Sequence, residues 1–256
     1  MGLLPFIELA IKLERRMNDS VGDGIRAARS SWTFGGRVAD TFDEHVERSV
    51  PLYREGHRLV CELSDFFVKP GSRVLELGCS TGTLTLAIAE FNQHKTDVIY
   101  CGIDVEASMI ERASERLKTV DFAGVEFVAS DLMDFEFGKS DLVLSYYTLQ
   151  FVSPSIRQTI VNRIYESLNW GGAFVLFEKV RGPDARFQDI LTSLYQDYKS
   201  ARGFSSDEIL SKARSLKGVL EPFSSNANKE MLERSGFRDI MPIQRFICFE
   251  GILAIK

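Results

Sequence analysis

Residues 73–82, R-V-L-E-L-G-C-S-T-G, constrain the fold more than any other part of this chain. They begin as an apolar run of strand length, and Gly78 and Gly82 then open a loop of small residues. The residues that follow, T-L-T-L-A-I-A-E, have the composition of a helix start. A strand, a glycine loop and a helix in this order build a nucleoside-binding crevice, because glycine allows close ligand approach and a helix N-terminus offers unpaired N–H groups.

Strand and helix patterns alternate after this unit. The further predicted elements are strands at 98–104, 125–130, 141–145, 173–178, 237–243 and 247–255, helices at 107–118, 154–168 and 228–235, and a turn at 169–172. Gly236 supplies a C-cap signal for the last helix. The order predicts an α/β fold: a Rossmann-like, doubly wound and mostly parallel seven-stranded sheet with an antiparallel C-terminal strand.

Two regions depart from this rhythm and are predicted to be caps. Residues 1–60 are helical and loop-like, with a turn at 32–36, and should cover the crevice. Near the start, Leu4, Ile7 and Ile11 share one helical face, which would pack on the cap or on a dimer partner, or bind a membrane surface. Residues 61–256 then form the binding domain, and the polar helical stretch 184–220 is a cap inserted into it.

Composition argues against several classes of partner. The net charge is −5 and no block of Lys or Arg stands out, so nucleic-acid binding is not favoured. No stretch is long enough to span a bilayer. The cysteines and histidines are scattered and lack zinc spacing, so we expect no metal site and reduced thiols in a cytoplasmic protein. These residues are Cys61, Cys79, Cys101, Cys248, His45, His57 and His94. The expected partner is a small-molecule substrate.

Three acids stand at or near the ends of the three leading strands, Glu76, Asp104 and Asp131. Adjacent strand ends line one crevice in a doubly wound sheet, so we expect these carboxylates to lie together. Asp104 follows Gly78 at nearly the spacing at which an acid accepts hydrogen bonds from ribose hydroxyls. Asp131 would accept from an adenine amino group, and Glu76 would orient the ligand or hold loop N–H groups.

The glycine loop lacks the third glycine of G-x-G-x-x-G, so a dinucleotide pyrophosphate is a poor fit. The loop suits a ligand with a zwitterionic tail, and S-adenosylmethionine, with its adenosine, sulfonium and amino-acid tail, meets that description. We therefore expect S-adenosylmethionine as a cosubstrate or as the sole substrate.

Several runs make a family resemblance specific. They are W-T-F at Trp32, E-R-S-V-P-L-Y at 47–53, L-G-C-S at 77–80, M-I-E-R at 109–112, T-L-Q-F at 148–151, F-E-K ending at Lys179, and G-F-S with E-I beyond it at 203–209. The chain resembles class I S-adenosylmethionine-dependent methyltransferases and, within them, the carboxy-S-adenosylmethionine synthase family of tRNA wobble-uridine modification. The resemblance covers roughly residues 32–256 and implies a homodimer.

The resemblance also implies roles for individual residues. It puts Tyr53 on the methionyl end of the ligand and Val105 beside the adenine, whose edge Asp131 and Leu132 would hold. Together with the reasoning above, the predicted ligand-binding residues are Tyr53, Glu76, Gly78, Cys79, Ser80, Gly82, Asp104, Val105, Met109, Asp131, Leu132 and Ser145. The predicted catalytic residues are Tyr53, Tyr146 and Tyr147.

Two positions depart from the family pattern. Tyr146 stands where the family has an asparagine before T-L-Q-F, and Ala213 stands where it has the arginine that pairs with the carboxylate of its product. Arg214 lies one residue on, about 100° round a helix, where a bidentate pair would be lost. Tyr146 and Tyr147 either place an aromatic face near the sulfonium or simply pack and face solvent.

Four hypotheses follow. The leading one is methyl transfer to a small-molecule acceptor, with Tyr53, Tyr147 or His45 as possible general bases. Two alternatives keep S-adenosylmethionine: carboxy transfer from prephenate, and cyclisation of S-adenosylmethionine to azetidine-2-carboxylate with release of methylthioadenosine. The fourth is a ligand sensor without catalysis.

Overall fold

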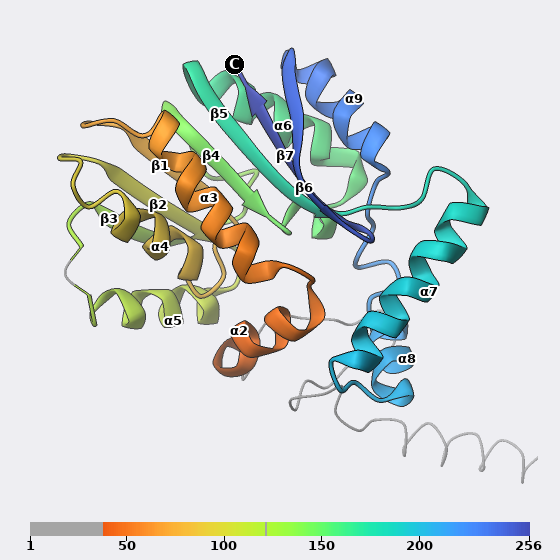
Figure 1. Cartoon of the computed structure of the whole chain (residues 1–256). Coiled ribbons are helices and arrows are strands. Elements are labelled where there is room, and N and C mark those ends of the chain that lie inside the picture. The colour runs from red at the N-terminus through yellow and green to blue at the C-terminus, as the bar shows by residue number, and fades with distance from the viewer. Residues whose placement is uncertain (1–37, 121) are drawn as a thin grey trace, which may run out of the picture.

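The computed structural model describes residues 38–120 and 122–256, and this part of the chain contains one seven-stranded sheet (Figure 1). The strands are β1 Arg73–Leu77, β2 Ile99–Asp104, β3 Val125–Ala129, β4 Ser140–Tyr146, β5 Leu168–Lys179, β6 Asp239–Phe246 and β7 Phe249–Ile255. Their order is β3-β2-β1-β4-β5-β7-β6, and β7 alone runs antiparallel to its two neighbours. The predicted mostly parallel sheet with an antiparallel C-terminal strand is confirmed.

Helices cover both faces of this sheet and the carboxyl ends of its parallel strands. They are α2 Val38–Ser49, α3 Tyr53–Phe67, α4 Thr83–Phe91, α5 Ala107–Leu117, α6 Pro154–Ser167, α7 Ala185–Ala201, α8 Ser206–Ser215 and α9 Ser225–Ser235, with a 3-10 turn at Leu149–Phe151. The last helix ends at Gly236, whose φ of 119° provides the predicted left-handed cap. The predicted boundary at residue 60 falls inside α3, which continues from the cap side onto the sheet.

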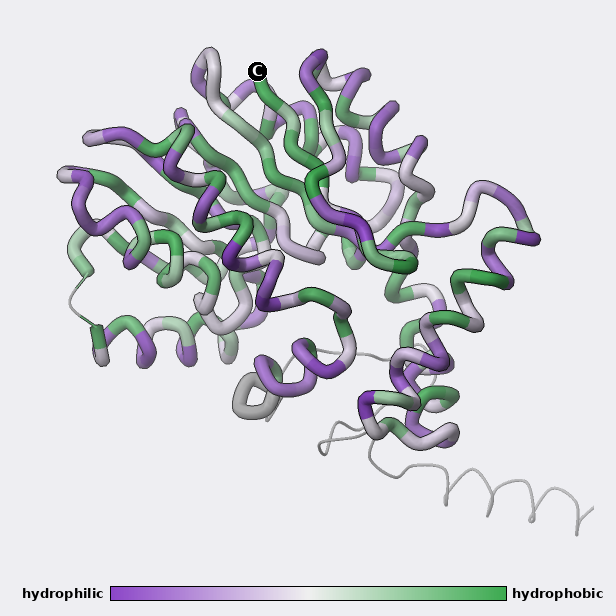
Figure 2. Tube along the Cα trace, in the orientation of Figure 1, coloured by the Kyte–Doolittle hydropathy of each residue, from purple (hydrophilic) through white to green (hydrophobic). Residues whose placement is uncertain are grey.

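Side-chain alternation in β1 explains why the sheet is covered twice. Val74 belongs to the cluster formed with α3 and α4, whereas Leu75 and Leu77 belong to the cluster formed with α6 and α9. Successive side chains of a strand point to opposite faces, so an unbroken apolar run indicates a strand buried on both sides. Figure 2 shows that the central strands are hydrophobic and that α2 is mostly hydrophilic.

The predicted turn at 169–172 is wrong. These residues belong to β5, where the pairing with β4 shifts register between Ser140 and Leu142. The C-terminal residue of the chain holds this stretch in place: Gly171 N–H donates to the carbonyl of Lys256 at 2.9 Å, and Lys256 N–H donates to the carbonyl of Gly172 at 3.0 Å. The dipeptide Gly-Gly signals a turn locally, but strand pairing with a distant segment overrides it.

The caps stand where the parallel strands end. Figure 1 shows α7 and α8 beside the ends of β4 and β5, and α2 lies on the same side of the molecule. The predicted N-terminal helix with Leu4, Ile7 and Ile11 and the turn at 32–36 lie outside the described residues. Within residues 38–120 and 122–256, no helix is long and apolar enough to cross a membrane.

Candidate functional site

A cavity of about 580 Å³ opens at the carboxyl ends of the parallel strands, beneath α2, α7 and α8. Its size is that of a site for a cofactor or a drug-sized ligand. Of the predicted site residues, the structure brings Tyr53, Glu76, Gly78, Cys79, Ser80, Asp104, Val105, Met109, Asp131, Leu132, Tyr146 and Tyr147 to its wall. Gly82 and Ser145 do not line it.

The glycine loop forms the floor of the cavity. Gly78 has a φ of 72°, and a Cβ built there would lie 2.3 Å from the side chain of Thr148, so glycine is required by both backbone and space. Ser80 also has a positive φ, 50°, and its hydroxyl lies 3.5 Å from Sδ of Met109. Gly78, Cys79 and Ser80 line the cavity.

Gly82 has a packing role in the structure, and its place in the ligand site stays a prediction. Its φ is 74°, and a Cβ there would lie 2.5 Å from the ring of Phe127 and 3.0 Å from Cβ of Ala113. The residue lets α4 begin against β3 and α5. Packing alone is enough to explain why glycine is needed at this position.

Ser145 is the second predicted site residue that does not line the cavity. Strand alternation sends its side chain to the face opposite Tyr146, where it is fully buried and its hydroxyl has no hydrogen-bond partner within the described residues. In the strand register Ser145 lies beside Leu77 and Leu176. Ser145 adjoins the two tyrosines in sequence, but its side chain lies on the other face of the sheet from Tyr146.

Asp104 is positioned by the loop it faces. Its Oδ2 accepts from the N–H of Ser80 at 2.9 Å, and its Oδ1 accepts from the N–H of Glu106 at 3.0 Å. Burial raises the pKa of this carboxyl, against the lowering effect of these N–H donors. Each oxygen retains capacity for another hydrogen bond, so the carboxylate fits a pair of ribose hydroxyls.

Asp131 follows β3 and lines the cavity. Its Oδ1 accepts from the N–H of Met133 at 2.7 Å, which fixes the side chain at the start of a turn. Val105 and Leu132 line it too, and Val105 is 66% exposed whereas Leu132 is half-buried. The exposed side chain of Val105 offers an apolar surface that an adenine ring would fit.

Glu76 is buried on the cavity floor, where its Oε2 accepts from the hydroxyl of Thr85 on α4. Burial raises the pKa of Glu76 to about 8, with Asp104 adding to the rise and the Thr85 hydrogen bonds opposing it. The side chain thus ties β1 to α4 and also faces the cavity. A cationic ligand group nearby would favour its ionised form.

Three aromatic side chains meet above the floor. The ring centroids of Tyr53 and Tyr146 lie 5.2 Å apart, and those of Tyr146 and Tyr147 lie 4.8 Å apart, both edge to face. His57 packs on the same group, 4.6 Å from Tyr53. Aromatic faces attract cations, most strongly where water is excluded, so this group suits a sulfonium.

Tyr147 carries backbone strain. Its φ is 61°, a conformation that is rare for a bulky residue, and its N–H donates to the carbonyl of Phe177 at 2.8 Å. Its buried hydroxyl has no hydrogen-bond partner within residues 38–120 and 122–256. Both Tyr146 and Tyr147 are under 10% exposed and line the cavity, so neither is a solvent-facing side chain.

The predicted general bases are poorly suited to take up a proton from this resting geometry. Burial raises the pKa of Tyr53 and of Tyr147 above the ordinary range, which keeps both phenols protonated. The third, His45, is engaged: its Nε2 lies 3.3 Å from the hydroxyl of Ser49 and also contacts Nζ of Lys212. Burial lowers the pKa of the neighbouring His57 to about 4, so that imidazole is neutral.

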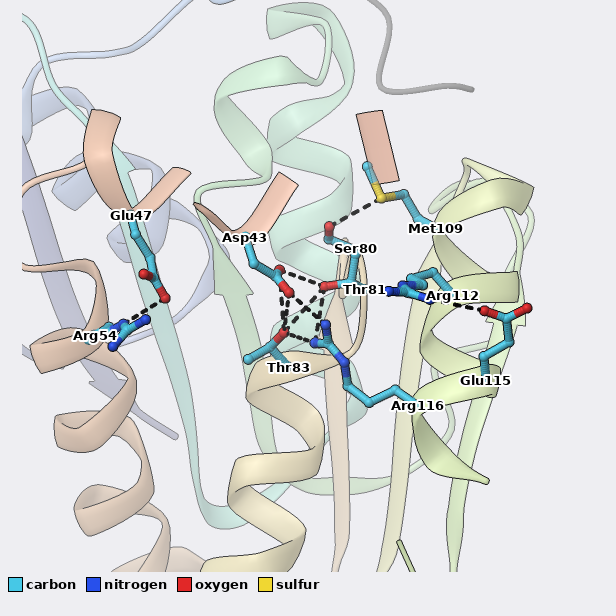
Figure 3. A network of polar contacts seen from close by, with 10 residues as sticks. All are labelled: Asp43, Glu47, Arg54, Ser80, Thr81, Thr83, Met109, Arg112, Glu115 and Arg116. Carbon is cyan, nitrogen blue, oxygen red and sulfur yellow. Dashed lines mark hydrogen bonds and ion pairs between the residues drawn. The ribbon is translucent and has the colours of Figure 1, made fainter. Parts of the chain in front are cut away.

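Asp43 on α2 was missed by sequence reasoning, although it holds the cap on the glycine loop (Figure 3). Its Oδ2 pairs with Nη2 of Arg116 at 2.6 Å, and its Oδ1 accepts from the hydroxyl of Thr81 at 2.7 Å. Thr83, the first residue of α4, lies in the same network. No local pattern marks one acid in a polar helix as special, so only the folded arrangement identifies it.

The α7–α8 cap supplies the other end of the cavity. Lys199, Lys212 and Ala213 line it, together with Lys179 at the carboxyl end of β5, whereas Arg214 does not. Ala213 and Arg214 are successive residues of α8, so their side chains leave the helix about 100° apart. Of these lysines, the sequence had marked only Lys179, within F-E-K.

The groups that line the cavity fit an organic ligand. Within the described ranges, no group of three or more His, Cys, Asp or Glu side chains has the arrangement of a metal site. The acids and exposed backbone of the floor fit an adenosine and an amino-acid tail, and the aromatic group fits a sulfonium beside them.

Comparison with known proteins gives three concordant results. A family model described as a methyltransferase domain matches residues 74–172. The carboxy-S-adenosyl-L-methionine synthase of Staphylococcus epidermidis is 36% identical over 226 residues, which cover 88% of this chain and 97% of that protein. The protein of the same name from Campylobacter lari is 36% identical over 224 residues, covering 87% and 94%.

Solved structures share the fold. The S-adenosylmethionine-dependent methyltransferase SibL in its apo form matches with a TM-score of 0.62 and 15% identity, over 100% of this chain and 70% of that one. An O-methyltransferase family protein from Burkholderia thailandensis matches with a TM-score of 0.62 and 16% identity, over 86% and 60%. At these identities the two structures bear on the fold alone.

Proposed function

We propose that this chain, which belongs to the carboxy-S-adenosyl-L-methionine synthase family, transfers the methyl group of S-adenosylmethionine to a small-molecule acceptor. The chain is an S-adenosylmethionine-dependent enzyme of the methyltransferase fold. The sulfonium of that ligand supplies an electrophilic methyl carbon, so the protein's task is to align an acceptor and exclude water.

One observation carries the proposal: a single cavity joins the nucleoside crevice to a compartment beneath α7 and α8. Asp104 and Asp131 lie at one end, where we assign them to the ribose and the adenine. Tyr195 and Ala213 lie at the other end, on the cap. The room at the cap end supports a second substrate, and the aromatic group of Tyr53, Tyr146 and Tyr147 between the two ends supports a reaction centre shielded from water.

Carboxy transfer is the second candidate function. The names of the relatives favour it, and Lys212 provides a cation on the cavity wall directly beside the position at which the family arginine is replaced by Ala213. Lys212 is already engaged with His45 and Ser49, and an ammonium lacks the planar fork of a guanidinium. These two facts make methyl transfer the stronger proposal.

The reaction is tested by analysing products by mass spectrometry. The purified protein is incubated with S-adenosylmethionine alone, with prephenate, and with a panel of small carboxylic acids. Accumulation of S-adenosylhomocysteine only when an acceptor is present supports methyl transfer. A product heavier than S-adenosylmethionine by one carboxyl group supports carboxy transfer, and methylthioadenosine without any acceptor supports cyclisation to azetidine-2-carboxylate; either outcome overturns the main proposal.

A cytoplasmic location and a homodimer are further parts of this proposal. The four cysteines are free and buried, which supports a reducing compartment. The dimer rests on the family resemblance. Cell fractionation tests the location, and light scattering on the full chain tests the dimer.

A further inference from the structure

Two lysine ammonium groups converge on one tyrosine ring at the cap end of the cavity. Nζ of Lys179 lies 4.6 Å from the ring centroid of Tyr195, and Nζ of Lys199 lies 4.5 Å from the same centroid. Lys179 ends β5 and Lys199 lies in the last turn of α7, so the pair bridges the sheet and the cap. The Tyr195 hydroxyl donates to the carbonyl of Ser49 at 2.9 Å, which fixes the ring.

Neither ammonium has a hydrogen bond or an ion pair within the part of the chain that the structure describes. Lys95, by contrast, is paired: its Nζ lies 2.7 Å from Oδ1 of Asp65. Lys199 is only 8% exposed, and burial together with the Lys179 charge lowers its pKa to about 8. A buried and unpaired cation is costly, so its retention calls for an anion that arrives from outside the chain.

Charge is divided along the cavity. The acids that line it are Asp43, Glu76, Asp104, Glu106 and Asp131, all from α2 and from the ends of β1, β2 and β3. The lysines that line it come from β5, α7 and α8. The acidic end matches a ligand with hydroxyl donors and a sulfonium, and the opposite end therefore matches a negatively charged second ligand.

The surroundings of the pair define what else that ligand would carry. The rings of Tyr147 and Tyr195 each pack edge to face on Phe249, with centroids 5.8 Å and 5.1 Å away. The buried thiol of Cys248 also faces the lysines, and burial raises its pKa, so it adds no negative charge. An apolar or aromatic body would pack on these rings while its anionic group reached both ammonium groups.

We infer that Lys179 and Lys199 bind a carboxylate group of the acceptor, in the compartment between the carboxyl end of β5 and the cap helix α7. The inference rests on the proposed function, because it assigns this compartment to the second substrate. Two ammonium donors on one carboxylate satisfy both of its oxygens. Bound in this way, the carboxylate also neutralises the charge that the fold leaves unpaired.

The test measures binding of benzoate to the full chain saturated with S-adenosylhomocysteine, by calorimetry, with benzamide as the neutral probe of the same shape. The variants are Lys179→Met and Lys199→Met, and the matched control is Lys118→Met at the exposed end of α5. We expect benzoate to bind at least tenfold more tightly than benzamide. Each site variant should lose at least tenfold of that affinity, and the control should lose none.

Thermal unfolding provides a second readout that a merely structural role would not produce. Replacing an unpaired buried cation by methionine should raise the melting temperature of Lys199→Met by about 2 °C or more. Equal binding of benzoate and benzamide, no benzoate binding, unchanged binding by the variants, or a lowered melting temperature would each overturn the inference. If S-adenosylhomocysteine fails to bind while benzoate binding still depends on the lysines, the proposed function falls and the carboxylate site stands.

Discussion

The hydroxyl of Tyr146 donates a 2.7 Å hydrogen bond to the backbone carbonyl of Tyr53, which joins the end of β4 to the first turn of α3. Gly56 makes room for this contact, since a Cβ there would lie 2.2 Å from the Tyr146 hydroxyl oxygen. Tyr146, the residue that stands where the resemblance predicts an asparagine, is therefore part of the packing against α3. It orients two aromatic rings at the centre of the cavity.

Tyr146→Phe should test whether this hydroxyl has a structural or a chemical role. We expect a loss of about 1 kcal/mol of unfolding free energy, because one buried hydrogen bond is removed. Affinity for S-adenosylhomocysteine should change by less than about tenfold, or 1.4 kcal/mol, since the ring remains. Chemical denaturation and calorimetry measure the two quantities. Loss of turnover without loss of stability would instead make the hydroxyl catalytic.

Asp104→Ala should weaken binding of S-adenosylmethionine at least about tenfold, which is 1.4 kcal/mol or more. The variant removes the acceptors assigned to the ribose hydroxyls, and it also frees the N–H groups of Ser80 and Glu106. Asp104→Asn separates these effects, because it keeps one side-chain acceptor and removes the charge. Asp239→Ala, at the distant edge strand β6, is the control. Unchanged calorimetric affinity in Asp104→Ala would remove the ribose assignment.

Gly82→Ala should lower the free energy of unfolding more than it weakens ligand binding. The new methyl group would meet the Phe127 ring at 2.5 Å in a backbone conformation that disfavours alanine. We expect a loss of about 1–3 kcal/mol of unfolding free energy, measured by denaturant titration. Phe127→Leu in the same chain should restore part of it by opening space. A stable Gly82→Ala variant that fails to bind S-adenosylhomocysteine would instead support a place for Gly82 in the ligand site.

The sheet and the acidic end of the cavity could be predicted from the sequence because local patterns mark both of them. The run around Glu76 and the acid of Asp104 each adjoin a periodic strand, and strand ends converge by topology alone. Lys199 and Asp43 lie in polar helices that carry no such mark, and their roles arise from contacts with segments far away in sequence. The predicted turn at 169–172 was wrong for the same reason, because Gly171 bonds to the C-terminal Lys256, far away in sequence.

Asp43→Ala should loosen α2 without unfolding the sheet. The pair of Asp43 with Arg116 is about one-third exposed on each side, so its loss should cost only about 0.2–1 kcal/mol. Yet the same carboxylate also holds the hydroxyl of Thr81. We expect faster limited proteolysis within α2 and a melting temperature lowered by no more than roughly 4 °C. Arg112→Ala, whose partner Glu115 lies on the same helix, is the control. Equal cleavage rates in both variants would contradict the role of Asp43 in holding α2 on the glycine loop.

Glu76→Gln should change how stability depends on pH. Burial raises the pKa of Glu76 to about 8 from an ordinary value of 4.5, so between these values the folded protein holds a proton that the unfolded chain has lost. Unfolding then releases a proton, and rising pH destabilises the wild type by up to about 1.4 kcal/mol per pH unit in this window.

Glutamine keeps the acceptor for Thr85 and cannot ionise, so Glu76→Gln escapes this loss. Measured by denaturant titration without ligand, the two proteins should have similar stability at pH 5, and the variant should be more stable at pH 8. Glu178, whose pKa burial also raises to about 8, titrates in both proteins and cancels in the difference. A difference that stays constant from pH 5 to pH 8, or that reverses, would mean that Glu76 is ionised in the folded protein.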